Sequence, residues 1–379
     1  MPIYKSGTKK KDGKQKYLVR VNYVDSLGKK RQYTRVAYGL EEAKRVEMEL
    51  NYQKNEPTSK KLTLSELVDK YLESHKYEVR ESSLDTTQRM LKHHVLTDKY
   101  KNIKIDKLTV PVLQQWKDEI NNTDLSIVSK QHVFGEFRAL LNWAVKTELL
   151  PKNNLLKVGN FKAPLERKKE MLFYTVDEFS KYIAVAKQKA EENLANNNYT
   201  GYGIYTFFMI AFFTGMRKGE INALTWDDID ANIIHITKSV TQKIGGGDKI
   251  TAPKNASSIR DIEIPYPLMD ALNEQKERCK CQPNFSEDWY ICGGVRPLRD
   301  TPLTVANTKI AEGAGVKHIR IHDFRHSHAS LLANEGINIQ EVARRLGHSK
   351  IEMTWNRYSH LYPRESERAL QVLNKIEVK

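Results

Sequence analysis

Two polar linkers divide this chain of 379 residues into three segments with different hydrophobic periodicities. The first linker covers residues 55–60 and contains Pro57, and the second runs from Pro151 to Lys169. Apolar residues alternate before the first linker and recur at helical spacing after it. The pattern predicts three domains, over residues 1–56, 57–165 and 166–379.

The first segment predicts a small antiparallel sheet. Residues 17–24 and 31–36 mix β-branched and aromatic side chains, and turn signals flank residues 17–24 on both sides. A helix is expected from Gly39 to about Gln53. The result would be a three-stranded sheet backed by one helix, with basic residues on or beside the strands. These candidates for DNA contact are Arg20, Lys29, Lys30, Arg31 and Arg35.

The middle segment predicts a bundle of about four helices. Thr63-Leu64-Ser65-Glu66 is a capping box, after which apolar residues follow at helical spacing. Further amphipathic stretches cover about residues 84–96, 110–121 and 126–148.

The third segment predicts a mixed α+β domain that is mostly helical, so the chain as a whole is expected to be mainly α. A capping box at Thr175 starts a long helix to about Asn196, and an apolar run covers residues 205–213. Strands are expected at residues 233–236 and 260–265, joined through the glycines at 245–247. Mostly helical segments then run to the end of the chain.

Positive charge is concentrated at the front of the chain. Lys and Arg number 62 against 47 acidic residues, which gives a net charge of +15. Residues 1–35 alone hold eleven Lys or Arg and two acids. This distribution indicates an N-terminal part that binds a polyanion. A basic N-terminal arm that only increases solubility would show the same charge. No apolar run approaches the ~20 residues that span a bilayer, and three cysteines cannot form a disulfide scaffold.

Three short motifs in the third segment combine residues suited to binding an anion. Arg217 and Glu220 stand three residues apart after the apolar run, as do His322 and Arg325 further on. Each pair shares a helix face. A buried structural Arg–Glu pair is an equally good interpretation of the first motif taken alone.

The last motif places a histidine and a tyrosine near helix ends. Asn338 and Glu341 form a predicted capping pair, and Gly347 ends that helix just before His348. Ser349 is predicted to cap the next short helix, at whose end Tyr358 lies.

In order and spacing, these motifs resemble those of the tyrosine recombinases, specifically the lambda-type integrases of temperate phages and conjugative transposons. Thr214-Gly215-Met216-Arg217 matches the first arginine motif, His322-Asp323-Phe324-Arg325 the His-x-x-Arg box, and Leu346-Gly347-His348 the second histidine motif. Tyr358 follows ten residues later, where the family has its nucleophile. The resemblance covers the whole chain.

The resemblance implies site-specific integration and excision of a mobile element through a covalent 3′-phosphotyrosyl intermediate and a Holliday junction. Arg217, Arg325 and His348 would bind the phosphate, Glu220 would support Arg217, and His322 would accept the proton of Tyr358. Lys254 matches the general acid of the family's β-hairpin, with Lys243 and Lys249 as alternatives. No cofactor or metal is implied.

The resemblance also implies partners and domain roles. Residues 1–56 would bind arm-type sites, residues 57–165 the core site, and four copies would assemble on DNA in the bacterial cytoplasm, at the nucleoid. An excisionase or a host DNA-bending protein would assist. A tail helix over about residues 365–376 would dock on a neighbouring copy or on its own domain.

Three other hypotheses compete with recombination. The chain would be a DNA-binding protein without catalysis, a topoisomerase with the same chemistry, or a metal-dependent nuclease. The nuclease would use residues His322, Asp323, His326 and His328. A zinc site at Cys279, Cys281 and Cys292 is a weaker idea, because Cys-x-Cys departs from the usual zinc spacing.

Overall fold

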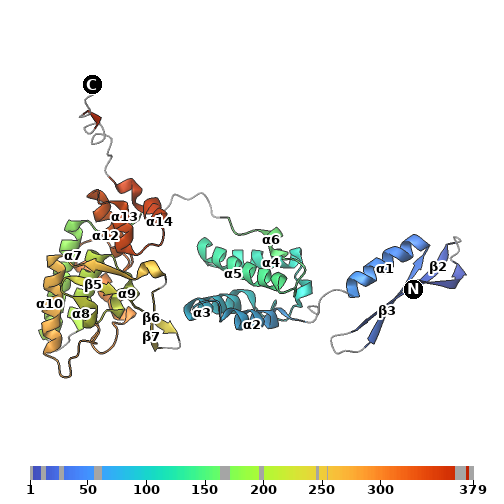
Figure 1. Ribbon diagram of the computed structural model, residues 1–379, viewed down its shortest axis with the longest axis horizontal. Coiled ribbons are helices and arrows are strands. Elements are labelled where there is room, and N and C mark those ends of the chain that lie inside the picture. The colour runs from blue at the N-terminus through green and yellow to red at the C-terminus, as the bar shows by residue number, and fades with distance from the viewer. Residues whose placement is uncertain are drawn as a thin grey trace. The chain divides into compact units, whose positions relative to one another are not determined.

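The computed structural model divides into two compact units, residues 1–166 and 167–379, which are described separately (Figure 1). The structure describes residues 3–9, 14–24, 30–54, 62–162, 171–195, 200–244, 247–253, 255–362 and 373–374. The predicted tail helix lies almost entirely outside the described residues. Among these residues, no helix combines the length and apolar character needed to cross a membrane.

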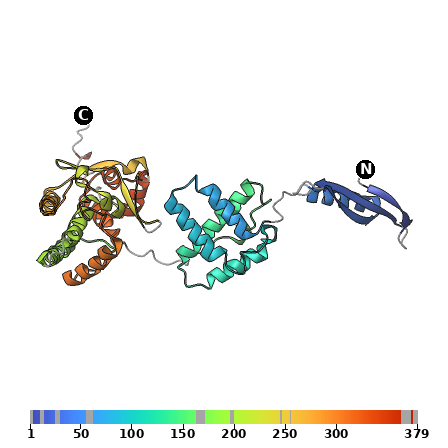
Figure 2. The same ribbon diagram turned by 90° about the horizontal axis from the view of Figure 1, so that it is seen from below.

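The first unit begins with the predicted three-stranded antiparallel sheet and its helix (Figure 2). The strands run in the order β1, β2, β3, and a small apolar core forms between the sheet and α1. The elements are β1 (Ile3–Lys9), β2 (Gln15–Val24), β3 (Lys30–Tyr38) and α1 (Leu40–Lys54).

The strand register separates Arg20 and Arg35, the two arginines of this sheet whose side chains the structure describes. Arg20 is opposite Thr34, whereas Arg35 is opposite Val19, which is buried under α1. Because paired residues lie on the same face, Arg20 is on the open face and Arg35 is on the α1 side. Arg35 forms an ion pair with Glu49 of α1, at 3.4 Å.

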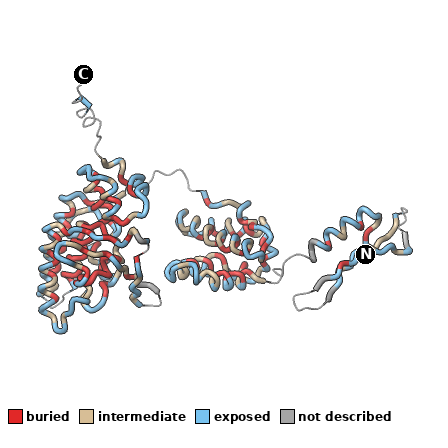
Figure 3. Tube along the Cα trace, in the orientation of Figure 1, coloured by how far each residue is buried: buried red, intermediate tan, exposed pale blue. Residues whose placement is uncertain are grey.

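The rest of the first unit is a helical bundle with its own apolar core (Figure 3). Thr63 and Glu66 form the expected capping box at the start of α2. The expected helix over 84–96 begins earlier, at Glu81, and ends in one π-helical turn. The elements are α2 (Leu64–His75), α3 (Glu81–Met90), η2 (Leu91–Val95), η3 (Ile105–Lys107), α4 (Val110–Asn121), α5 (Ile127–Lys146) and α6 (Leu155–Val158).

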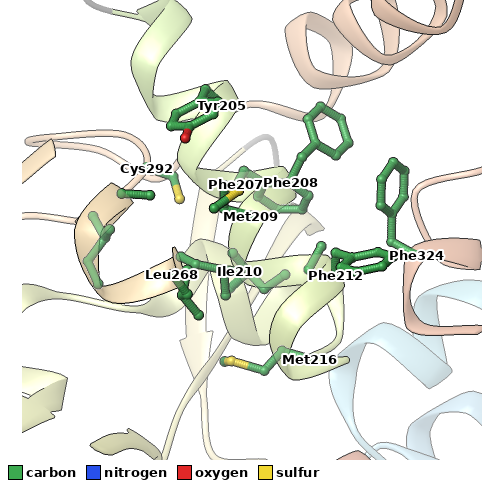
Figure 4. Close-up of a cluster of buried hydrophobic side chains, with 14 of the residues drawn as sticks. Tyr205, Phe207, Phe208, Met209, Ile210, Phe212, Met216, Leu268, Cys292 and Phe324 are labelled. Atoms are coloured by element: carbon green, nitrogen blue, oxygen red, sulfur yellow. The ribbon is translucent and has the colours of Figure 1, made fainter. Parts of the chain in front are cut away.

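The second unit is built around a buried apolar helix, α8 (Thr200–Thr214). The long helix α7 (Val176–Ala195) packs against it, with the rings of Phe179 and Phe212 stacked at 3.7 Å between centroids. Phe208 of α8 packs against Phe324 of α12 (Asp323–Asn334), with 4.9 Å between the ring centroids, and Figure 4 shows both side chains in this core. This core fixes the C-terminal end of α8, where Arg217 follows.

The strands of the second unit form a sheet and a separate hairpin. The two predicted strands pair directly with each other, as β5 and β8, and β4 adds to the sheet edge. The segment between them folds into the β6–β7 hairpin, which the resemblance implied although the local sequence pattern did not predict its two strands. The elements are β4 (Ile229–Asp230), β5 (Ile233–Ile236), β6 (Ser239–Ile244), β7 (Gly247–Thr251) and β8 (Arg260–Glu263).

Helices complete the second unit, as expected. Gly347 ends α13 with a φ of 64°, but Asn338 caps it by accepting from the N–H of Gln340 rather than pairing with Glu341. The prediction that Ser349 caps the last helix is wrong, because α14 starts after Lys350 without a side-chain cap. The remaining elements are α9 (Lys218–Ala223), η4 (Trp226–Asp228), η5 (Ala256–Ser258), α10 (Tyr266–Lys280), α11 (Asp300–Ala314), α13 (Ile339–Leu346), α14 (Ile351–Tyr358) and η6 (Ser359–Leu361).

Candidate active site

One cavity of about 480 Å³ in the second unit collects five of the six residues predicted to be catalytic. They come from α12 and the residue before it, from the turn before α9, and from the segment that contains α13 and α14. The residues lining the cavity are Arg217, His322, Arg325, His326, His348, Met353, Asn356, Arg357 and Tyr358. The sixth, Lys254, lies outside the described residues. Of its alternatives, Lys249 is exposed on β7, and the side chain of Lys243 is outside the described part of the chain.

Arg217 is held at the start of α9 by the carboxylate predicted to support it. Its Nη1 donates to Glu220 Oε1 at 2.8 Å, and its backbone N–H donates to Glu220 Oε2 at 3.0 Å. Its Nη2 also donates to the carbonyl of Gly347, at 3.2 Å. The Arg217 side chain remains 38% exposed, so the part of the guanidinium left free can reach a ligand.

Glu220 is buried between two arginines, of which only Arg217 was predicted from the sequence. Arg260 Nη2 donates to Glu220 Oε2 at 2.9 Å, and both side chains are 3% exposed. Burial alone would raise the pKa of Glu220, but Arg260 and Arg217 outweigh it and hold that pKa below its ordinary value. The carboxylate is therefore charged at neutral pH. The signal in the sequence was Arg260 itself, which begins the expected strand on the same face as the apolar Ile262.

Arg325 is the buried cation of the cavity. Its Nη1 donates to the carbonyl of Gly215 at 2.8 Å, and its Nη2 to that of Leu346 at 2.6 Å. Burial and nearby Arg217 lower the pKa of Arg325 to about 9, which leaves the guanidinium charged at neutral pH. Two neighbouring positive charges beside one cavity make it a site for an anion.

His348 lines the same cavity, directly after the helix-ending Gly347. Its Nδ1 is hydrogen bonded to the Thr354 hydroxyl at 2.8 Å. Burial, together with the positive charges of Arg325 and Arg217, lowers the pKa of His348 to about 4. The ring is neutral at physiological pH, and Nε2 is the nitrogen that can bond a ligand in the cavity.

The Tyr358 side chain is 1% exposed and its hydroxyl is bonded to a histidine. That partner is His326, whose Nδ1 lies 2.5 Å from the Tyr358 hydroxyl. His322, the predicted proton acceptor, has its ring edge-on to the ring of His326 at 5.2 Å. Burial raises the pKa of Tyr358 to about 12. The sequence pattern indicated His326 only as a candidate metal ligand and indicated no role for Arg357.

The residues of the metal-nuclease hypothesis have other partners. Asp323 accepts two hydrogen bonds from the Arg320 guanidinium, at 3.0 and 2.9 Å. His328 Nδ1 donates to the carbonyl of Phe212 at 2.9 Å. Within the described ranges, no three His, Cys, Asp or Glu residues gather in a way that could hold a metal ion.

We expect the buried His328 to make the fold acid-labile. Burial lowers its pKa from an ordinary 6.5 to about 3, and its Nε2 is buried with no hydrogen-bond partner among the described residues. Between these pH values the unfolded chain binds the extra proton, so stability is lost as pH falls below about 6.5. Between pH 6 and 4, His328 should make the unfolding free energy of the wild type fall by up to about 1.4 kcal/mol per pH unit. His328→Leu should remove this part of the fall.

The measurement is urea unfolding of the full chain at several pH values. His360→Gln, which changes an exposed histidine, serves as the control and should keep the wild-type slope. If the unfolding free energy of His328→Leu falls with pH as steeply as that of the wild type, His328 is not the cause of the acid lability.

The comparisons with known proteins place the chain among the integrases. The family model described as "Phage integrase family" matches residues 182–365, and "Phage integrase, N-terminal SAM-like domain" matches residues 63–121. The ICEBs1 integrase of Bacillus subtilis is 29% identical over 377 residues, which covers 95% of this chain and 97% of that protein.

Two groups of solved structures share the fold. The Tn1549 transposon integrase in complex with a circular intermediate DNA matches with a TM-score of 0.65 and 19% identity, covering 82% of this chain and 99% of that one. A lambda integrase tetramer bound to a Holliday junction matches with a TM-score of 0.55 and 15% identity, covering 92% and 96%.

The family models and the integrase relative define the class as enzymes that cleave and rejoin DNA. The chain belongs to the phage integrase family of tyrosine recombinases.

Proposed function

We propose that this protein integrates and excises a mobile element by site-specific recombination, with Tyr358 as the nucleophile. The observation that carries the proposal is the single cavity that brings together Tyr358, two arginines and two of the predicted histidines. These residues are separated by up to 141 positions in the chain, from Arg217 to Tyr358, and share one site because of the fold.

In the cleavage step, Tyr358 Oη would bond to the scissile phosphorus as the bond from phosphorus to the 5′-oxygen breaks. The product is a 3′-phosphotyrosyl ester, which a DNA 5′-hydroxyl attacks in the rejoining step. Arg217 and Arg325 would bind the nonbridging oxygens, and His348 would donate a further hydrogen bond through Nε2. His322 would accept the phenolic proton, and Lys254 would protonate the departing 5′-oxygen.

The electrostatic design of the cavity supports this chemistry. Arg325 lines the cavity and uses two of its five N–H groups on the carbonyls of Gly215 and Leu346, so a further N–H group could donate to a phosphate. Glu220 holds Arg217 from the protein side. Fixed cations of this kind stabilise the charge that develops on a phosphoryl oxygen without reorganising during the reaction.

We propose that the three segments divide the work of binding DNA, residues 1–56 on arm-type sites and residues 57–165 on the core site. The open face of the β1–β3 sheet supports the first assignment, because it carries exposed Arg20 and Tyr4, with the guanidinium 5.4 Å from the ring centroid. Arg35 forms its ion pair on the other face. Lys29 lies outside the described residues, as do the side chains of Lys30 and Arg31.

The assembly is proposed by analogy with the lambda integrase tetramer seen on a Holliday junction. Four copies would bring two duplexes together and exchange one pair of strands at a time. An excisionase or a host DNA-bending protein would set the direction, and the bacterial nucleoid would be the place of action.

The test is covalent capture on a nicked duplex that spans the junction between the encoding element and its flanking chromosome. Loss of the short fragment beside the nick prevents rejoining, so a protein–DNA adduct should accumulate, and peptide mapping should place the DNA on Tyr358. Adduct formation should be unchanged in EDTA, because arginines supply the positive charge. A strand cut that needs a divalent ion and leaves no adduct would instead support the nuclease hypothesis.

A further inference from the structure

The hydrogen bond between Tyr358 and His326 joins two buried side chains on different helices. His326 is 4% exposed on α12, and Tyr358 ends α14. The distance from His326 Nδ1 to the Tyr358 hydroxyl oxygen is 2.5 Å. Either atom could be the donor in this hydrogen bond. Its direction matters because Tyr358 is the proposed nucleophile.

Arg357 determines the direction of this hydrogen bond, because it contacts the other nitrogen of the His326 ring. Its Nη1 lies 3.3 Å from His326 Nε2. A guanidinium can only donate, so Nε2 must carry the lone pair. The ring is neutral near pH 7, because burial and the neighbouring His322 and Arg357 lower the pKa of His326 to about 4. The ring hydrogen is therefore on Nδ1, and His326 donates to the Tyr358 oxygen.

We infer that His326 is a positioning residue that donates a hydrogen bond to the phenolic oxygen of Tyr358, and that Arg357 fixes the tautomer that makes this donation. The inference deepens the proposed function and rests on it for its role in catalysis. His326 cannot be the base that takes the phenolic proton, because its lone pair faces Arg357. Its place in the reaction is to stabilise negative charge on the phenolic oxygen.

The protons balance with His326 unchanged throughout. In cleavage, the bond between Tyr358 Oη and phosphorus forms, the bond to the 5′-oxygen breaks, the phenolic proton passes to His322, and the 5′-oxygen takes a proton from Lys254. In rejoining, these transfers reverse and the departing phenolate accepts the His326 hydrogen bond. The bond is strongest when the oxygen carries charge, which favours both steps.

The tautomer can be measured without DNA. Nitrogen-15 NMR of the full chain, labelled on histidine, distinguishes a protonated Nδ1 from a protonated Nε2, and His326→Gln assigns the signal. We expect the Nδ1–H form in the wild type and a shift toward the Nε2–H form in Arg357→Ala. Arg344→Ala removes another exposed arginine, one that does not line the cavity, and should leave the tautomer unchanged. An Nε2–H form in the wild type would overturn the inference.

The catalytic role is tested by the rate of adduct formation on the nicked duplex. His326→Ala should slow it about 10- to 100-fold, the effect of losing a hydrogen bond to a charged group. His326→Asn, whose amide nitrogen can occupy the position of Nδ1, should recover most of the rate. Arg357→Ala, at an exposed position that does not threaten folding, should also slow it.

The outcomes separate the two proposals. An adduct that forms at the wild-type rate in His326→Ala, or an Asn variant no faster than the Ala variant, would overturn the role of His326 while leaving the recombinase proposal intact. A wild-type protein that forms no adduct would overturn the recombinase proposal, and the NMR measurement would still decide the tautomer.

Discussion

Tyr358→Phe is expected to abolish covalent capture of DNA and leave DNA binding within about twofold of the wild type. The substitution removes one oxygen atom, the proposed site of the phosphodiester bond, and no residual route to a covalent adduct remains. The phenyl ring keeps the packing of Tyr358 against the apolar cluster that includes Val342 and Leu346. Gel-shift titration measures binding, and denaturing electrophoresis of the nicked-duplex reaction measures the adduct.

Tyr362→Phe provides the matched control, because Tyr362 lies four residues on and packs against the same cluster. It should form the adduct at the wild-type rate. An adduct that persists in Tyr358→Phe and disappears in Tyr362→Phe would show that the nucleophile has been assigned to the wrong tyrosine.

Glu220→Ala is expected to lower the free energy of unfolding by about 3–5 kcal/mol. The variant leaves the buried guanidinium of Arg260 without its 2.9 Å partner, and an uncompensated buried charge costs about this much. It also releases Arg217, so the remaining folded protein should cleave DNA more slowly. Urea unfolding measures the stability, and the rate per folded molecule on the nicked duplex measures the second effect.

Glu263→Ala is the control for loss of a carboxylate. Glu263 is 63% exposed, and its ion pairs with Arg344 and Arg345 measure 3.5 Å. Exposed pairs contribute roughly 0–1 kcal/mol, so this variant should be nearly as stable as the wild type. Equal losses in the two variants would mean that Glu220 does not act through the buried arginine pair.

Local signals in the sequence predicted most of the fold. The capping boxes at Thr63 and Thr175 placed the starts of α2 and α7, since each depends on residues three positions apart. The resemblance implied the β6–β7 hairpin, but the local pattern did not predict its strands, because the glycines near residue 245 were interpreted as a connection between the flanking strands. The Ser349 cap failed because a matching residue pattern does not guarantee the backbone geometry of a cap.

The candidate site was predicted as a set of residues but not as a network of contacts. The spacing of Arg217, His322, Arg325, His348 and Tyr358 pointed to these residues, and the structure brings them to one cavity. The links from Arg260 to Glu220 and from His326 to Tyr358 span 40 and 32 positions. Such contacts depend on tertiary packing, which no local pattern in one sequence encodes.

The turn after α13 contacts both arginines through consecutive carbonyl groups. Leu346 accepts from Arg325, and Gly347 accepts from Arg217. Gly347 has a left-handed φ of 64°, and a Cβ there would lie 2.9 Å from Arg260, so the turn has little freedom to adjust. A displacement of this one turn would therefore disengage both guanidinium groups at the same time, and the affinity of the cavity for an anion would change as a unit.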